Sequence, residues 1–147
     1  MTLKTILAAK GGVVSIEPTA DLVAAVKLLN THRIGVLVVI DAGGRLVGIL
    51  SERDIIRVLA ESAGAALQLS VAQVMTRNVS TCGVNDSISS ILKRMTTGKF
   101  RHMPVLDNHR LVGLVSIGDI GKQQTEMLRD HLRQLTEDID QISLMKL

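Results

Sequence analysis

The apolar positions of the chain follow a strand period in some stretches and a helix period in others. A continuous apolar run at residues 33–40, rich in Val and Ile, predicts a strand buried on both faces. Turn residues at 41–44 follow it, so the next apolar run, 46–50, is expected to return antiparallel as a hairpin. Apolar residues spaced by four and three predict a helix before this hairpin: Leu22, Val26 and Leu29.

The same order of elements occurs a second time. Strands are predicted at residues 79–82, 101–106 and 111–115, with a helix that begins at Asn85 or Asp86. A constant offset of 65 positions relates Gly48 to Gly113, Ser51 to Ser116 and Asp54 to Asp119. Such an offset indicates an internal repeat of β-α-β-β-α units. Each unit is too small to bury its own sheet, so we expect an α+β fold in which two units pack about a pseudo-twofold axis.

Each unit contains a junction where a strand enters a helix. Residues 45–55 and 110–120 share seven of their eleven positions and end in Leu-Val-Gly, two apolar residues and Ser-x-x-Asp-Ile. Ser followed by Asp three residues later predicts a helix start, whose amide groups and partial positive charge attract phosphate. The purely structural alternative is a capping box. The repeated Gly48 and Gly113, which a cap does not require, favour a functional junction.

The composition narrows the classes of function. Phe100 is the single aromatic residue, so the stacking platforms of single-strand nucleic-acid binding are absent, and the net charge of +3 is scattered. We therefore do not expect a nucleic-acid partner. Cys82 is the single cysteine, which excludes an intrachain disulfide and suggests a reducing compartment. No apolar run is long enough for a membrane span or a signal peptide, so a cytoplasmic protein without membrane attachment is expected.

The repeat and its motifs resemble a tandem pair of CBS domains, named after cystathionine β-synthase and also called a Bateman module. The resemblance covers residues 3–121 and rests on the two junctions, on Val-Ala-Gln-Val-Met-Thr at 71–76 and on Phe-Arg-His-Met-Pro-Val-Leu-Asp at 100–107. It implies two three-stranded sheets with four main helices, adenosine-bearing ligands between the repeats, and dimerisation. The expected divisions are a first repeat with an N-terminal helix at 1–62, a second repeat with its linker at 63–121, and a C-terminal helical extension at 122–147.

The acidic residues of the junctions are expected to bind sugar. A carboxylate is repelled by phosphate, so Asp54 and Asp119 suit a ligand only through hydroxyl donors such as a ribose diol. The resemblance likewise assigns ribose to these two residues, and it places Ser51 and Ser116 near phosphate or sugar. Helix capping is compatible with these roles, because one residue can do both.

The second half-site is the better candidate by sequence. Polar and basic residues surround its middle strand, whereas Arg33 precedes a purely apolar run in the first copy. Adenine needs hydrogen bonds at its edge, which the backbone beside Thr81 and Cys82 can supply, and it needs an apolar slot. The candidates for the slot are Met103, Val105 and Ile117, and the residues around the strand are Lys99, Arg101, His102 and Pro104.

Arg53 and His102 each allow two interpretations. An Arg in the first turn of a helix opposes the helix dipole, so either a bound phosphate or a carboxylate such as Glu52 must offset Arg53. His102 either faces the ligand or fills the sheet surface. Gly118, which matches Arg53 in the other copy, leaves open backbone that a ligand can approach closely.

Neither a metal site nor a catalytic centre is predicted. The four His residues and Cys82 show no metal-ligand spacing. No nucleophile elbow or phosphate-loop motif occurs, and no nucleophile, base and orienting group can be assembled from the sequence. We therefore expect a binding module rather than an enzyme.

The last helix is predicted to continue beyond the repeats with an apolar seam. The seam residues recur at spacings of four and three over about two heptads, which is short for a coiled coil. It can pack on its own domain or on a partner subunit, and we favour the second, because CBS pairs bury exposed helix faces by dimerising. The seam residues are Leu128, Leu132, Leu135, Ile139 and Ile142.

The combined expectation is a non-catalytic sensor that binds an adenine nucleotide as a homodimer and acts on a separate, unknown effector protein. AMP is the first choice of ligand, with ATP, ADP, NAD(H) and S-adenosylmethionine as alternatives. The basic residues from Lys99 to His102 favour a phosphorylated ligand. The alternative function is a ligand-free dimeric interaction scaffold.

Overall fold

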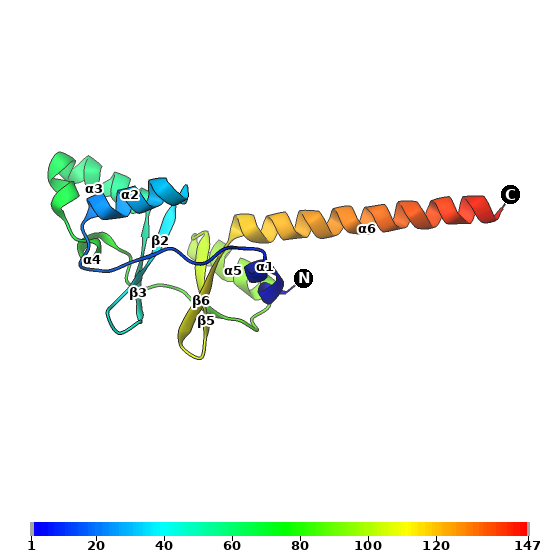
Figure 1. Ribbon diagram of the computed structural model, residues 1–147, viewed down its shortest axis with the longest axis horizontal. Helices are drawn as coiled ribbons and strands as arrows, with labels where there is room; N and C mark the ends of the chain where they lie inside the picture. The colour runs from blue at the N-terminus through cyan, green and yellow to red at the C-terminus, as the bar shows by residue number, and fades with distance from the viewer. Residues whose placement is uncertain (1, 147) are drawn as a thin grey trace.

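Two three-stranded sheets of the same topology form the body of the molecule, which a computed structural model describes for residues 2–146 (Figure 1). In each sheet the short first strand pairs parallel with the middle strand, and the last strand returns antiparallel. The α+β class with two repeats is therefore confirmed. In chain order the elements are α1 (Leu3–Ala8), β1 (Ser15–Ile16), α2 (Leu22–His32), β2 (Val36–Ile40), β3 (Leu46–Ser51), α3 (Glu52–Ser62), the 3-10 helix η1 (Ala63–Gln68), α4 (Val71–Val74), β4 (Cys82–Gly83), α5 (Ile88–Gly98), β5 (His102–Asp107), β6 (Arg110–Ser116) and α6 (Ile117–Met145).

The middle strand of each sheet is buried, as its continuous apolar pattern predicts. Leu37, Val38 and Val39 are fully buried on β2, and Met103 and Val105 are fully buried on β5. Both hairpins carry a register shift at the matching position, directly after Val39 and directly after Val105. The two repeats are thus alike in detail as well as in strand order.

Helix α5 begins later than predicted. Its N-cap is Ser87, not Asn85 or Asp86. Asp86 does not cap the helix because its carboxylate accepts a hydrogen bond from the Gly83 amide at 3.0 Å and pairs with Arg94 at 3.5 Å. The acidic residue therefore ties the helix to the strand before it.

Three smaller features also differ from the prediction. Strand β4 has two residues instead of the four at 79–82, because the backbone oxygen of Thr81 before it accepts a hydrogen bond from the Arg94 side chain. The start of the expected linker forms the helix η1 rather than an extended segment. On α2, Ala25 takes the core position expected for Val26, which is 39% exposed.

The N-terminal helix and the linker helix each pack on the other repeat. Leu3 and Ile6 of α1 enter the core of the second sheet, and Val71 and Val74 of α4 enter the core of the first. Figure 1 shows α1 beside α5 and β6, at the far side of the molecule from α4. Although α1 is grouped by sequence with the first repeat, its packing partner is the second. Each core is completed by a segment from outside its own repeat.

The repeated glycines make room for these exchanged segments. A Cβ atom on Gly48 would lie 2.6 Å from Sδ of Met75 and 2.9 Å from the backbone oxygen of Thr76. A Cβ atom on Gly113 would lie 2.5 Å from Cδ2 of Leu7 on α1. Both glycines therefore serve close packing. Packing is thus a structural reason for their repetition that the sequence analysis did not consider.

Helix α6 starts on the second sheet and then leaves the body (Figure 1). Ile120 in its first turns is fully buried, whereas every residue from 124 to 146 is exposed. Within the described part of the chain, no helix is both long enough and apolar enough to span a membrane.

Candidate functional site

Two clefts lie between the repeats, and each takes its walls from both. Cleft A, of about 360 Å³, is formed by residues 10–14 and 34–36 of the first repeat and by β6 and the start of α6. Cleft B, of about 640 Å³, is formed by β3 and the start of α3, together with residues within 76–80 and 98–102 of the second repeat. Both volumes suit a small ligand. This reciprocal exchange is what a twofold relation between the repeats produces.

Each cleft ends at a helix start with the same capping box. Oγ of Ser51 accepts from the Asp54 amide at 3.1 Å, and Oδ2 of Asp54 accepts from the Ser51 amide at 2.9 Å. Ser116 and Asp119 repeat this arrangement at 3.0 and 2.9 Å. The capping role and the candidate site therefore coincide in the same four side chains, all of which line a cleft.

The first helical amides are already bonded to the neighbouring strand. The amide of Glu52 donates to the backbone oxygen of Gly35, and the amide of Ile117 donates to that of Arg101, both at 2.9 Å. With the third amide of each helix bonded to the Ser hydroxyl, the helix starts offer fewer free donors than the sequence suggested. An anion in either cleft must therefore rely mainly on basic side chains.

The two carboxylates differ in accessibility. The Asp54 side chain is 9% exposed, and its Oδ1 lies 3.1 Å from Nη1 of Arg57. The Asp119 side chain is 27% exposed, and its Oδ2 lies 2.5 Å from Nζ of Lys10. A hydroxyl group can therefore reach Asp119 with less rearrangement than Asp54.

Lys10 is a residue of cleft A that the sequence analysis missed. Its Nζ donates to Asp119 and, at 2.6 Å, to the backbone oxygen of Leu114. Burial by itself raises the pKa of Asp119, but hydrogen bonds from Lys10 and Ser116 and the charge of Lys10 outweigh it, so the pKa lies below its usual value. The available signal was a basic residue directly before Gly11 and Gly12, next to the first strand.

His102 lies where the two clefts meet. Together with Gly35 and Val36 it lines both of them. Burial lowers the pKa of His102, and the charge of Lys10 lowers it further, with Asp119 acting in the opposite direction. The imidazole is therefore neutral near pH 7 and offers one donor and one acceptor. This position suits the interpretation in which His102 faces a ligand.

Basic side chains from both repeats line cleft B. Arg53 comes from α3, whereas Lys99 and Arg101 come from the turn before β5. The sequence analysis grouped Lys99 and Arg101 with Asp119 in one half-site, but the structure places them in different clefts. The reason is the twofold exchange, which sets the loops of each repeat against the helix start of the other. Only His102, among the described residues predicted for the site, lines both clefts.

Comparison with known proteins agrees with this architecture. The sequence model of the CBS domain matches twice, at residues 7–61 and 71–123. This chain belongs to the CBS domain family. The solved structure of a CBS-domain-containing protein from Agrobacterium tumefaciens is 41% identical, with a TM-score of 0.80 over 84% of this chain and 92% of that one. The chain is thus a tandem CBS pair in sequence and in fold.

Two further relatives extend the comparison. The CBS domain pair of protein MJ0100, solved in complex with 5′-methylthioadenosine and S-adenosyl-L-methionine, is 28% identical, with a TM-score of 0.76 over 86% of this chain and 98% of that one. An uncharacterised 17.7 kDa protein of Acidianus ambivalens is 32% identical over 108 residues, which are 73% of this chain and 64% of that protein. This chain therefore spans less than two thirds of that relative.

Several predicted site residues of the CBS pair are buried within its second repeat. Cys82 and Met103 lie in the core, Ile117 packs against it, and Pro104 is buried on β5 between Met103 and Val105. Burial, and then the charge of Asp86, raises the pKa of the Cys82 thiol to about 11. Within the described residues these four line neither cleft, so they influence a ligand only by positioning the backbone. No group of three His, Cys, Asp or Glu side chains in that part of the chain is placed to hold a metal.

Arg33 and Gly118 were predicted for the site, but neither lines a cleft. Arg33 ends α2 with a φ of 53° and lines a separate groove between α2 and α3. Lys99 ends α5 with a φ of 58° in the equivalent position, but it lines cleft B. A Cβ atom on Gly118 would lie 3.6 Å from Oγ of Ser116, an ordinary contact. A side chain would therefore fit at this position, but Gly118 lines neither cleft.

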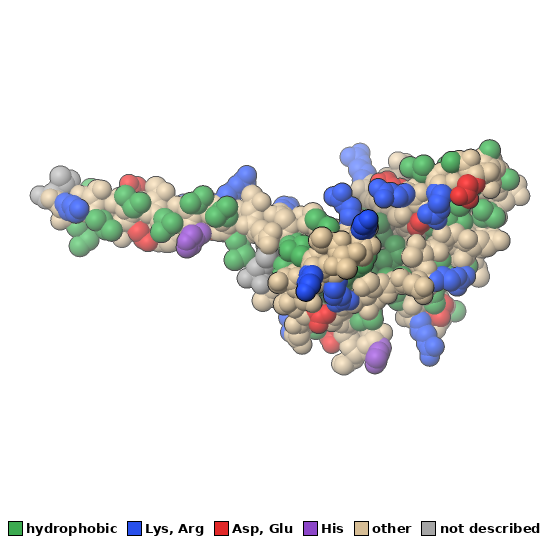
Figure 2. All heavy atoms as spheres, turned by 180° about the vertical axis from the view of Figure 1, so that it is seen from behind, with side chains coloured by type: hydrophobic (Ala, Val, Ile, Leu, Met, Phe, Trp, Pro, Cys, Tyr) green, Lys and Arg blue, Asp and Glu red, His purple; other side chains and the backbone are tan. Residues whose placement is uncertain are grey.

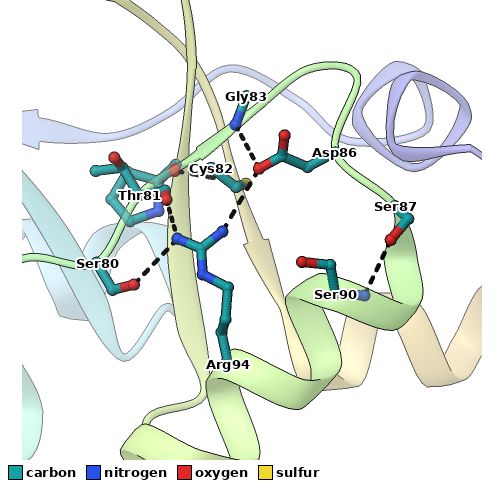
Figure 3. A network of polar contacts seen from close by, with 9 residues as sticks. Ser80, Thr81, Cys82, Gly83, Asp86, Ser87, Ser90 and Arg94 are labelled. Carbon is teal, nitrogen blue, oxygen red and sulfur yellow. Dashed lines mark hydrogen bonds and ion pairs between the residues drawn. The ribbon is translucent and has the colours of Figure 1, made fainter.

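Arg94 organises the segment before β4, and the sequence analysis missed it (Figure 3). Its guanidinium lies 3.3 Å from Oγ of Ser80 and 3.5 Å from the Asp86 carboxylate, and it also donates to the backbone oxygen of Thr81. Ser80 lines cleft B, so Arg94 positions part of that wall. Leu28 stands at the matching position of α2, 66 residues earlier, just as Arg33 matches Lys99, so cleft A lacks this clamp. The signal was this Leu-to-Arg difference between the copies.

Proposed function

We propose that this CBS pair is a non-catalytic regulatory module that binds an adenine nucleotide between its repeats. The observation that carries the proposal is the pair of reciprocal clefts, each ending at a Ser/Asp helix start and joined at His102. The related CBS pair of protein MJ0100 was solved with two adenosine-bearing ligands, which supports the same ligand class here. AMP is our first choice within that class.

The ribose of the nucleotide is placed at Asp119 in cleft A. A ribose hydroxyl donates to the carboxylate, which then needs Lys10 less as a partner. Val13, Val14 and Ile34 line the same cleft and offer aliphatic surface to the adenine. They take the role that the sequence analysis gave to Met103, Val105 and Ile117, which the fold places in or against the core.

The charge of the clefts favours a phosphorylated ligand over S-adenosylmethionine. Lys10 and Asp119 balance each other in cleft A, whereas Arg53, Lys99 and Arg101 outnumber Glu52 and Asp54 in cleft B, on the other side of the junction at His102. A hydrogen bond to a charged group contributes about 1.5–3 kcal/mol net of solvent. The excess of basic side chains therefore favours a phosphate over a cationic sulfonium.

A thermal-shift series tests the proposal. The purified protein is heated with AMP, ADP, ATP, NAD⁺, NADH, adenosine and S-adenosylmethionine, each at a concentration far above a micromolar dissociation constant. A ligand at about 100 times its Kd stabilises by about 2.7 kcal/mol, which raises Tm by roughly 5–11 °C for a chain of this size. We expect the largest shift with AMP. The absence of a shift with every phosphorylated ligand would contradict the proposal.

The alternative is a ligand-free dimeric scaffold. It is favoured by one observation, which is that Asp54 pairs with Arg57 and Asp119 pairs with Lys10, so both carboxylates are satisfied without a ligand. The double variant Asp54→Ala, Asp119→Ala separates the two functions. A sensor loses nucleotide affinity, whereas a scaffold keeps its partner and shows no nucleotide effect. Asp107→Ala, at an exposed carboxylate at the end of β5, is the matched control.

The proposed output is a change in binding to a separate effector protein by a homodimer. The observation that favours a homodimer is an apolar groove between α2 and α3. Its exposed apolar side chains include Val26, Ile56 and Leu59, with exposures of 39%, 64% and 37%. Light scattering of the purified protein, with and without AMP, measures the oligomeric state.

A further inference from the structure

Helix α6 carries an uncovered apolar seam far from both clefts. Figure 1 shows the helix standing clear of the two repeats, and Figure 2 shows hydrophobic side chains along its length. The seam recurs at spacings of four and three, and its members are 45–62% exposed. They are Leu128, Leu132, Leu135, Ile139 and Ile142.

Such a helix requires a partner helix. An isolated helix is marginally stable in water, and most helices gain their stability from packing an apolar face. The side-chain hydrogen bonds recorded along this part of α6 are local, such as Gln134 to Asp138 and Thr136 to the backbone oxygen of Leu132. A period of 3.5 residues is that of a coiled-coil seam, in which a second helix of the same period covers the apolar positions.

The seam is symmetric about the point between Leu132 and Leu135. If two copies pair antiparallel about this point, Leu132 of each faces Leu135 of the other, and Leu128 faces Ile139. The outer Ile142 then faces Thr125, which is exposed. Every apolar seam residue therefore meets an apolar residue or a Thr.

The charges of α6 also favour opposite directions. From residue 122 to 133 three basic and two acidic side chains give a net charge of +1. From 134 to 146 one basic and three acidic side chains give a net charge of −2. Antiparallel pairing brings the positive half of one helix against the negative half of the other, whereas parallel pairing brings like charges together.

We propose that α6 forms an antiparallel two-helix coiled coil with α6 of a second copy, centred between Leu132 and Leu135. The contact is isologous, with the same residues on both sides of a twofold axis. Because each body lies at the N-terminal end of its own α6, the two bodies lie at opposite ends of the paired helices. About 23 exposed residues at about 1.5 Å each would separate them by about 35 Å. Because the two bodies are held apart, the same two copies cannot also meet through their α2–α3 grooves, which would join a different pair of copies. The α6 contact does not depend on nucleotide binding.

Disulfide cross-linking tests the direction of the pairing. Thr125→Cys and Ile142→Cys are purified separately, mixed, and oxidised gently, with the wild type as control because its Cys82 is buried. Antiparallel pairing predicts that the cross-linked product joins the two different variants. Thr125→Cys joined to itself would mean parallel pairing, and no cross-link would mean that something other than α6 of a second copy covers the seam. Either result would overturn the proposal.

A charged substitution in the seam tests its energetic role. Leu135→Glu, introduced into both cross-linking variants, places carboxylates at the centre of the paired helices. The initial rate of cross-linking is expected to fall at least about tenfold, a change that corresponds to about 1.4 kcal/mol. Gln141→Glu adds the same charge outside the seam and is expected to leave the rate within about twofold. An equal effect of the two substitutions would contradict pairing through the seam.

Discussion

Replacement of Lys10 by Met separates two opposing roles of this side chain in cleft A. Its Nζ lies 2.5 Å from Oδ2 of Asp119 and 2.6 Å from the backbone oxygen of Leu114. Ribose needs the same carboxylate, so Lys10 competes with the sugar. Phosphate needs a cation, so Lys10 assists the phosphate. Met keeps an apolar stem of similar length and removes the charge, so adenosine and AMP are expected to respond in opposite directions.

The size of each effect follows from the exposure of the ion pair. The Lys10 and Asp119 side chains are 33% and 27% exposed, so solvent screening limits their interaction to about 0.5–1 kcal/mol. Removing this competition is expected to tighten adenosine binding about two- to fivefold. AMP also loses a charged hydrogen bond of about 1.5–3 kcal/mol, so its net loss is about 1–2 kcal/mol, or roughly five- to thirtyfold in Kd.

Isothermal titration calorimetry measures both affinities directly. Wild type and Lys10→Met are titrated with AMP and with adenosine under identical salt conditions. Lys4→Met, at an exposed position of α1, is the matched control and is expected to change neither affinity. The reasoning would be refuted if both ligands changed in the same direction or if neither changed.

Three further predictions follow from the packing and the charges. Gly48→Ala pushes a Cβ atom against a backbone oxygen at 2.9 Å and is expected to lower the free energy of unfolding by about 1–3 kcal/mol. Gly113→Ala meets a flexible Leu side chain and is expected to cost less. Equal losses of Tm in calorimetry would contradict this. Arg94→Leu is expected to speed amide hydrogen exchange around β4 at least about tenfold relative to wild type and to leave exchange at β1 unchanged. The same change in exchange at both strands would mean that Arg94 has no local role at β4. The folded-state pKa of Asp119 lies below its unfolded value, so its stabilising effect is present above about pH 3.9 and is lost as the pH falls through the folded pKa. Urea unfolding of wild type and Asp119→Asn should therefore converge in acid, and a constant difference across the acid range would count against this assignment.

Local sequence signals were sufficient to predict the order of the main elements and the starts of α3 and α6, but not the start of α5. Ser51 and Ser116 cap their helices through bonds to residues three positions later, an interaction contained within a few residues of sequence. The buried run on β2 and the hairpin after it likewise depend on neighbouring residues. The internal repeat then predicted the second sheet from the first.

The make-up of each cleft could not be predicted in the same way. Lys10 and Asp119 are separated by 109 positions, and nothing in the pattern near either residue indicates that they meet. Their contact depends on the exchange of segments between the repeats. The same exchange explains why Gly48 and Gly113, interpreted by sequence as signs of a ligand site, are needed for packing. Local patterns therefore identified most of the chemistry but assigned it to the wrong combination of walls.

A crystal structure of the protein with AMP tests the central claim most directly. The account predicts AMP in cleft A, with its ribose hydroxyls about 3 Å from the carboxylate of Asp119 and its phosphate directed toward Lys10 and His102. AMP bound outside both clefts, or bound in cleft A with its ribose turned away from Asp119, would contradict it.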